Sequence, residues 1–203
     1  MPAVYRRAFS GAIIKESGEM KIAIMGFSGS GKSTLAKQLA QELNIEPLYL
    51  DRVHFQPNWI EREPEAAREI VRREMAKPRW VIDGNYTHLL REERMRDADE
   101  IIFLSYPRLV CLFRALKRHR EFRGNTRESM ADGCIERMNL EFAWWILHEG
   151  RTKPRVNGFW NIVRTYPQKT AVIRSDRELR KYLTKRKRRV DSDEKMNEGD
   201  KEI

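Results

Sequence analysis

The stretch GFSGSGKS at Gly26–Ser33 follows directly on the apolar run IAIM at Ile22–Met25. A glycine, four residues and then Gly-Lys-Ser is the pattern of a phosphate-binding P-loop. Downstream, apolar residues recur with a helical period from Leu35 to Leu43. The loop therefore lies where a strand hands over to a helix, and there backbone N–H groups and the positive helix end converge on an anion.

Each position of this loop has an expected task. Gly29 and Gly31 allow the backbone to approach phosphates and to take positive φ. Lys32 reaches the β- and γ-phosphate oxygens, and the Ser33 hydroxyl can ligate Mg²⁺. We therefore expect ATP and Mg²⁺ as cofactors; the alternative is a turn rich in serine and glycine that binds nothing. The expected nucleotide-binding residues are Gly26, Ser28, Gly29, Ser30, Gly31, Lys32, Ser33 and Thr34.

Length and composition indicate one domain with a hydrophobic core, and no apolar run approaches the roughly 18 residues of a membrane span. Cys111 and Cys134 have no paired spacing with each other or with His119 and His148, which argues against zinc. Free thiols fit a reducing cytoplasm. The net charge of +10 attracts polyanions, so nucleic acid is an open partner, although no helix-turn-helix or zinc-finger pattern supports direct DNA reading.

Short apolar runs alternate with helical patterns along the chain. This alternation predicts an α/β fold in three layers, with a five-stranded parallel sheet and helices on both faces. The expected strands are 21–25, 47–50, 79–82, 100–104 and 170–173, and the expected helices are 32–43, 64–77, 87–96, 107–121, 135–149 and 175–184.

Two aspartates follow expected strands at the carboxyl edge of the sheet, where ligands gather in such folds. Asp83 ends the strand 79–82, and we expect it to hold Mg²⁺ opposite Ser33. Its alternative role is to cap the next helix. Asp51 ends the strand 47–50 and is either a turn residue, a base for a hydroxyl acceptor, or a contact to the acceptor. Arg52 pairs with Asp51 or binds an acceptor phosphate.

Two further segments are candidates for the acceptor side and the lid. In the insertion at about 52–78, Phe55, Pro57 and Trp59 either wall a pocket for a flat or apolar group or pack the helix 64–77 onto the body. In the segment at about 118–134, Gly124 and Asn125 interrupt a basic helix. Four arginines flank this interruption: Arg118, Arg120, Arg123 and Arg127. We expect them to close over the transferred phosphate as a lid, although a solvated basic face is the alternative. Arg123 and Arg127 are the catalytic candidates of this group, beside Lys32 and Asp51.

Aromatic residues are frequent between 142 and 160, and their helical spacing favours core packing. They are Phe142, Trp144, Trp145, Phe159 and Trp160, with Ile146 among them.

Several segments carry a more specific pattern than the P-loop alone: Ile24–Ala36, Tyr49–Asp51, Val81–Tyr86, Ile101–Leu104, Arg123–Arg127 and Met130–Cys134. Over about residues 20–183 this pattern resembles the adenylate-kinase-like P-loop proteins labelled DNA topology modulation proteins. The resemblance implies a nucleotide-kinase-like fold, ATP binding and a role in DNA topology or its regulation. Ser105 stands where such a protein is expected to carry an aspartate after the fourth strand, so no catalytic role is placed there.

Two functions remain after these observations. The first is a Mg²⁺-dependent phosphotransferase that moves the γ-phosphate of ATP to a small acceptor. The second is a non-catalytic, ATP-binding regulator that contacts DNA or a protein through its basic surface. Acceptor-dependent release of ADP would indicate the first, and salt-sensitive DNA binding the second.

The two ends of the chain are expected to lie outside the domain at 20–184. Residues 1–19 show neither a strand nor a helix period, and Met20 is a plausible native start, so we expect a flexible extension. Residues 185–203 begin with a basic run and continue with acidic residues and almost no apolar ones, which is typical of a disordered tail.

Overall fold

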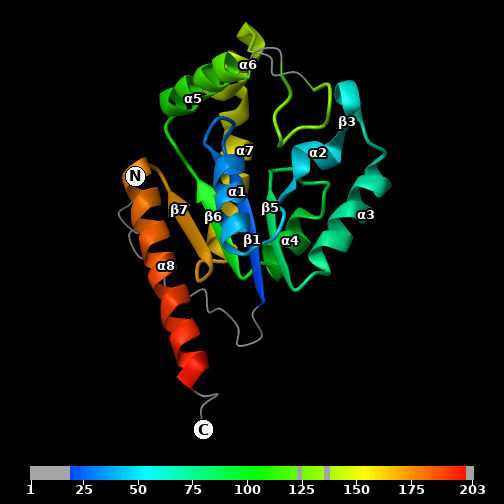
Figure 1. Cartoon of the computed structure of the whole chain (residues 1–203). Helices are drawn as coiled ribbons and strands as arrows, with labels where there is room; N and C mark the ends of the chain where they lie inside the picture. The colour runs from blue at the N-terminus through cyan, green and yellow to red at the C-terminus, as the bar shows by residue number, and fades with distance from the viewer. Residues whose placement is uncertain (1–18, 123–124, 135–137, 200–203) are drawn as a thin grey trace.

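The computed structural model describes residues 19–122, 125–134 and 138–199, with side chains as far as Arg188. Its centre is a sheet of five parallel strands in the order β2-β5-β1-β6-β7. This arrangement confirms the predicted α/β fold, with helices on both sides of the sheet (Figure 1). The strands are β1 (Met20–Gly26), β2 (Leu48–Tyr49), β5 (Arg79–Asp83), β6 (Glu100–Leu104) and β7 (Thr170–Ile173).

Helices cover both faces of the sheet, so the side chains of its strands are mainly apolar. Every residue of β6 is buried, and β1 is buried except at Lys21. Helices α1 (Lys32–Glu42) and α8 (Asp176–Gly199) lie in front of the sheet in Figure 1, and α7 (Lys153–Thr165) lies behind it. An ion pair of 2.6 Å from Arg186 to Glu42 joins α8 to α1. The remaining longer helices are α3 (Pro64–Met75), α4 (Arg91–Asp97), α5 (Arg108–Glu121) and α6 (Leu140–Leu147).

The prediction missed α7. Asn157 and Gly158 in its middle lower the helix propensity, although Val156, Phe159, Trp160 and Val163 recur at the spacing of one helix face. Burial of Phe159, Ile162 and Val163 against the core adds to its stability. The predicted helix 135–149 is shorter in the structure, which places α6 at Leu140–Leu147, while 135–137 lie outside the described residues.

The insertion between β2 and β5 is more regular than expected. It contains the short helix α2 (Leu50–His54), a small hairpin of β3 (Phe55–Gln56) and β4 (Ile60–Glu61) joined by the 3₁₀ turn Pro57–Trp59, and then α3. Asp51 therefore lies in the first turn of α2 and not at the end of a strand.

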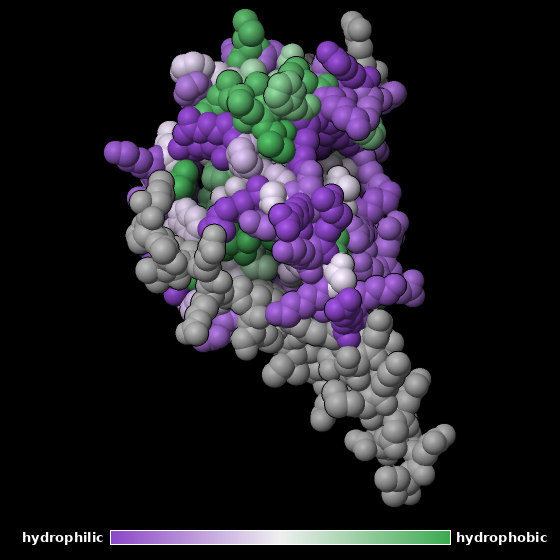
Figure 2. Space-filling model, turned by 90° about the vertical axis from the view of Figure 1, so that its left-hand side faces the viewer, coloured by the Kyte–Doolittle hydropathy of each residue, from purple (hydrophilic) through white to green (hydrophobic). Residues whose placement is uncertain are grey.

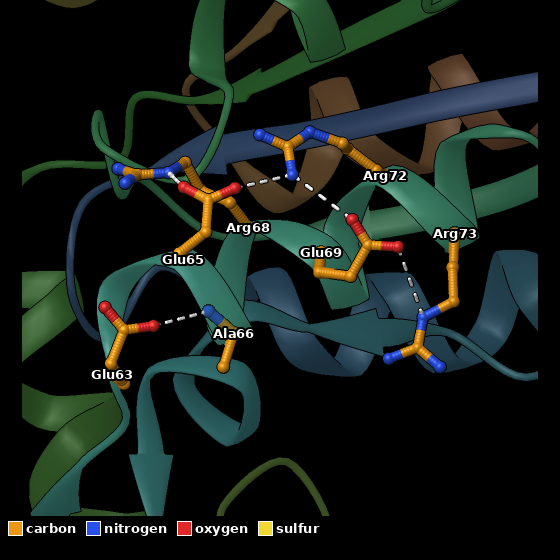
Figure 3. Close-up of polar contacts among 7 residues, drawn as sticks. All are labelled: Glu63, Glu65, Ala66, Arg68, Glu69, Arg72 and Arg73. Atoms are coloured by element: carbon orange, nitrogen blue, oxygen red, sulfur yellow. Dashed lines mark hydrogen bonds and ion pairs between the residues drawn. The ribbon is translucent and has the colours of Figure 1, made fainter.

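Charged residues cover the outer face of α3 with ion pairs (Figure 3). At its start, the Glu63 carboxylate accepts a hydrogen bond of 2.8 Å from the Ala66 amide, which caps the helix. Along the face, Arg68 and Arg72 both contact Glu65, at 2.8 and 2.7 Å. Arg72 also reaches Glu69, which in turn contacts Arg73. The arginines of α3 are thus engaged with glutamates of the same helix.

One end of the molecule exposes apolar side chains, seen as the green patch at the top of Figure 2. Trp144 on α6 is 54% exposed, so the prediction that it packs in the core is wrong. Ile146 and Phe159 are buried, and Phe142 and Trp160 pack against the core, as predicted. The exposed apolar residues of α5 and α6 are Leu109, Phe113, Leu116, Leu140 and Trp144.

The two ends of the chain were expected to lie outside the domain, and the structure describes only part of them. Of the extension expected at 1–19, residues 1–18 lie outside the described residues. Helix α8 continues to Gly199, through most of the segment expected as a tail. In the described ranges, no helix is both long and apolar enough to cross a membrane.

Candidate active site

The P-loop connects β1 to α1 and depends on glycine at two positions. Gly29 has φ +76° and Gly31, at the N-terminus of α1, has φ +94°, in the left-handed region that disfavours other residues. A Cβ atom on Gly29 would lie 2.3 Å from the carbonyl oxygen of Cys111. The loop therefore packs against the first turns of α5 too tightly for any side chain at this position.

The Ser33 hydroxyl and the Asp83 carboxylate meet at the carboxyl edge of the sheet. Ser33 Oγ donates a hydrogen bond of 2.7 Å to Asp83 Oδ2. The parallel strands β1 and β5 lie side by side and end at this edge. Strand β5 ends with Asp83, and the P-loop after β1 leads to Ser33 in the first turn of α1. The second carboxylate oxygen, Asp83 Oδ1, is buried without a hydrogen-bond partner among the described residues.

Burial raises the pKa of the Asp83 carboxyl to about 6, and the charge of Asp51 adds to the shift, whereas Lys32, Ser33 and Arg127 oppose it. A buried carboxylate with one unsatisfied oxygen beside a serine hydroxyl is a donor set that suits Mg²⁺. No group of three His, Cys, Asp or Glu side chains that could hold a metal occurs in the described part of the chain. A magnesium ion at Ser33 and Asp83 would therefore take its other ligands from water and nucleotide oxygens.

Two cations contact the P-loop backbone. Lys32 Nζ donates to the carbonyl oxygen of Phe27 at 3.2 Å, so its ammonium lies across the loop. Arg114 on α5 donates to the Ser30 carbonyl at 2.8 Å and also pairs with Asp176 at the start of α8. Arg114 thus ties the loop to α5 and α8, a role that was not predicted from the sequence.

The segment after β5 supports the loop from the other side. The Asn85 side chain bonds to Gly26 twice, accepting from its N–H at 3.1 Å and donating to its carbonyl at 2.7 Å. Arg94 of α4 is fully buried and donates to the carbonyls of Gly84 and Tyr86, at 3.4 and 2.8 Å. These bonds hold the turn that follows Asp83.

The Asp51 side chain contacts Tyr86, in the segment after β5. The Tyr86 hydroxyl donates a hydrogen bond of 2.9 Å to Asp51 Oδ1. Burial and the adjacent charge of Asp51 raise the pKa of Tyr86, so the phenol stays a donor. Arg52 points elsewhere, because its guanidinium donates to the Glu128 carbonyl at 3.4 Å. Sequence reasoning did not assign Tyr86; its only signal was its place in the segment Val81–Tyr86.

A single cleft of about 1340 Å³ brings most of the predicted residues together. Gly26 lies behind it, in contact with Asn85, and is the one predicted nucleotide-binding residue that does not line it. Arg123 falls outside the described residues. The predicted residues that line the cleft are Ser28, Gly29, Ser30, Gly31, Lys32, Ser33, Thr34, Asp51, Asp83 and Arg127.

The arginines expected in the lid lie in two kinds of structure. Arg118 and Arg120 belong to the last turn of α5, and only Arg118 of the two lines the cleft. Arg127 lies in the loop that follows and donates to Ser129 Oγ at 3.4 Å. Arg151, after α6, also lines the cleft and stacks 3.7 Å above the ring of Phe27 in the P-loop. No local pattern had singled out Arg151.

Aromatic rings form the wall opposite the P-loop. Phe55 and Trp59 line the cleft, as one of the two interpretations of this segment predicted, and Pro57 does not. Tyr86 and His88 continue the wall, with His54 behind them at 4.6 and 5.2 Å between ring centroids.

Comparison with known protein families finds a match over the part of the chain that contains the P-loop. Residues 22–83 match the family described as ATPase family associated with various cellular activities (AAA), a span that runs from β1 to Asp83. A search of curated protein sequences finds no match. Both the family match and the strand order agree with a P-loop nucleotide-binding protein.

Solved structures with a similar fold include two small-molecule kinases. Deoxyadenosine kinase from M. mycoides with bound dATP is 14% identical, with 82% of this chain and 98% of that chain covered and a TM-score of 0.45. The same enzyme with bound dCTP is 16% identical, with the same coverage and a TM-score of 0.44. Shikimate kinase from Bacteroides thetaiotaomicron is 15% identical over 77% of this chain and 87% of that chain, with a TM-score of 0.38. These values are too low to carry the activity of either enzyme over to this chain.

Proposed function

We propose that this protein is a Mg²⁺-dependent phosphotransferase that moves the γ-phosphate of ATP to a hydroxyl group of a small acceptor. One observation carries the proposal: the Asp51 carboxylate opens into the same cleft as the P-loop and Asp83. The two carboxylates have different partners, since Asp83 accepts from Ser33 and Asp51 accepts from Tyr86. Different surroundings suit different tasks, metal binding for one and proton transfer for the other.

The nucleotide would be held by groups on the P-loop side of the cleft. Backbone amides of Ser28–Ser33 surround the phosphates at the positive end of α1, and Lys32 leaves the Phe27 carbonyl to reach their oxygens. Ser33 and Asp83 would hold Mg²⁺, which supplies neutralisation of the phosphate charge when bound. Arg127 faces the same space and would contact the equatorial oxygens of the transferred group.

The acceptor would be a hydroxyl and not a phosphate. An alcohol must lose a proton as its oxygen bonds to the γ-phosphorus and the bond from that phosphorus to the β,γ-bridging oxygen breaks. The proton passes to Asp51, and ADP leaves with the electron pair of the broken bond. A phosphorylated acceptor needs no base and would be repelled by Asp51. Arg52, which would have to attract such an acceptor, is directed at Glu128.

An ADP-release screen tests the proposal. The purified chain is given Mg²⁺ and ATP with panels of nucleosides, nucleotides and other small hydroxyl compounds, and ADP formation is followed for each. We expect ADP release that depends on an unphosphorylated hydroxyl compound. ATP binding with salt-sensitive DNA binding and no acceptor-dependent release would support the regulator instead.

A further inference from the structure

Trp59 is held in an unusual backbone conformation at the tip of the β3–β4 hairpin. Asn58 and Trp59 have φ values of +63° and +65°, in the left-handed region that a bulky side chain such as tryptophan rarely enters. Asparagine tolerates this region, but a tryptophan persists there only where the surrounding structure holds it, and such strain gathers at functional sites.

The segment at 129–134, far away in the sequence, holds the turn in place. The amide of Asn58 donates to the Asp132 carbonyl at 3.2 Å. The amide of Trp59 donates to Cys134 Sγ at 3.3 Å, and the same thiol donates to the Gln56 carbonyl at 3.5 Å. Both strained amides are thereby engaged, and Cys134 is buried by this contact.

The turn places a partly exposed indole in the cleft. Trp59 lines the cleft and is 38% exposed, whereas Phe55 beside it packs against Met130, Ala131 and Cys134. The Phe55 and Trp59 rings meet edge to face, with centroids 5.2 Å apart. From Phe55 the aromatic wall continues through His54 to Tyr86, whose hydroxyl contacts Asp51.

Charge is distributed unevenly between the two sides of the cleft. The P-loop side carries Lys32, and α5 and the segment after α6 add Arg114, Lys117, Arg118, Arg151 and Arg155. The opposite wall carries rings and the Asp51 carboxylate, and Arg91, Arg127 and Glu128 line the cleft as well. The arginines of α3 do not line it, and Arg68, Arg72 and Arg73 pair with glutamates on the outer face (Figure 3). The rings, with Asp51 in contact with Tyr86, therefore suit a flat, uncharged group better than an anion.

We propose that Trp59, with Phe55 at its edge, forms a stacking subsite for an aromatic or heteroaromatic ring of the acceptor. This deepens the proposed function and rests on it: the acceptor is a hydroxyl compound with a flat ring, of which a nucleoside is one example. Its ring lies on the indole, and its hydroxyl lies toward Asp51. Stacking on a pre-positioned indole costs little side-chain entropy, and the left-handed turn is what holds the indole in position.

Binding experiments test the subsite without requiring turnover. Saturation-transfer NMR is run on the full chain with adenosine, guanosine, cytidine and thymidine as probes and with ribose as the probe that lacks a ring. We expect saturation of the nucleoside ring protons in the wild type. Trp59→Leu keeps an apolar side chain without a ring and should weaken nucleoside binding about tenfold or more. Trp59→Phe should retain most of it, and ATP affinity should be unchanged in both.

Trp144→Leu is the matched control, because Trp144 is also exposed but lies outside this cleft. It should bind nucleosides as the wild type does. Ribose bound as well as the nucleosides, or Trp59→Leu binding them as tightly as the wild type, would overturn the subsite. If either of these results came with ADP release that depends on an acceptor without a ring, the subsite would be wrong but the proposed phosphotransferase would be supported. Ring binding lost in Trp59→Leu but without any acceptor-dependent ADP release would support the subsite and contradict the transferase.

Discussion

Ser33 and Asp83, fifty positions apart in the chain, meet through a hydrogen bond of 2.7 Å that leaves the second Asp83 oxygen buried and unpartnered. A carboxylate in this situation lowers the stability of the metal-free protein, because its charge is removed from water and only partly compensated. The site therefore carries a stability cost that magnesium and nucleotide would relieve.

The stability of the metal-free protein should depend on the charge of Asp83. Burial raises the pKa of this carboxyl from 3.8 to about 6, so the folded state binds its proton more tightly than the unfolded state. The contribution of Asp83 to stability is therefore most favourable below pH 4 and falls as pH rises to 6, by about 1–3 kcal/mol in total. Asp83→Asn stays neutral, so it should melt above the wild type at pH 8 and level with it near pH 4. Thermal melts of both proteins across this range measure the gap, and a gap that does not change with pH would contradict the assigned shift.

Lys32→Ala should weaken ATP binding by more than about tenfold, because it removes a charge-assisted bond to phosphate. Its folded structure should survive, since among the described residues the ammonium makes a single hydrogen bond, to the Phe27 carbonyl. Lys77→Ala is a matched control, as this lysine pairs with Glu74 at the end of α3 and does not line the cleft. Titration calorimetry with ATP measures both. Equal affinities in folded Lys32→Ala and Lys77→Ala would remove the P-loop assignment.

Asp51→Asn should reduce turnover about 100-fold or more while ATP affinity is kept, because the amide cannot accept the acceptor proton. Tyr86→Phe keeps the ring and removes the hydroxyl that contacts Asp51. Tyr86→Phe should lower turnover about tenfold, because it loses one hydrogen bond to a charged group. Steady-state rates of ADP release with the best acceptor from the screen measure both effects. Undiminished turnover in Asp51→Asn would exclude the base.

Gly29→Ala should abolish ATP binding and lower the melting temperature by several degrees. Its Cβ would lie 2.3 Å from the Cys111 carbonyl oxygen, and its φ of +76° alone costs about 1–2 kcal/mol for any other residue. Gly158→Ala in α7 is the control, since the described atom nearest to its Cβ outside that helix would be Nη1 of Arg91, at 3.9 Å. Helix propensity should then raise stability by about 0.5–1 kcal/mol. Calorimetry and thermal melts on both variants check the contrast, and an unchanged Gly29→Ala would show that the loop does not pack as described.

The sheet and the P-loop could be predicted because they depend on consecutive residues. Apolar runs of strand length separated by helical periods indicate a parallel sheet, and such a sheet brings the ends of β1 and β5 to one edge. That topology was enough to expect Ser33 and Asp83 on the same side. Helix α7 escaped prediction because Asn157 and Gly158 lower its helix propensity, although its apolar residues recur at helical spacing.

The aromatic wall of the cleft was decided by tertiary structure. Pattern alone left Phe55 and Trp59 either in a pocket or in the core. The choice depends on a thiol 75 positions away, where Cys134 binds the amide of Trp59 and holds it at positive φ. Likewise, the contact between Tyr86 and Asp51 joins two segments that no periodicity relates. The amino-acid sequence by itself determined the phosphate-binding loop and the parallel sheet, since local backbone geometry and burial period are properties of neighbouring residues. Only packing between distant segments decided which rings and carboxylates share the cleft, because a side chain's partners depend on where the rest of the chain lies.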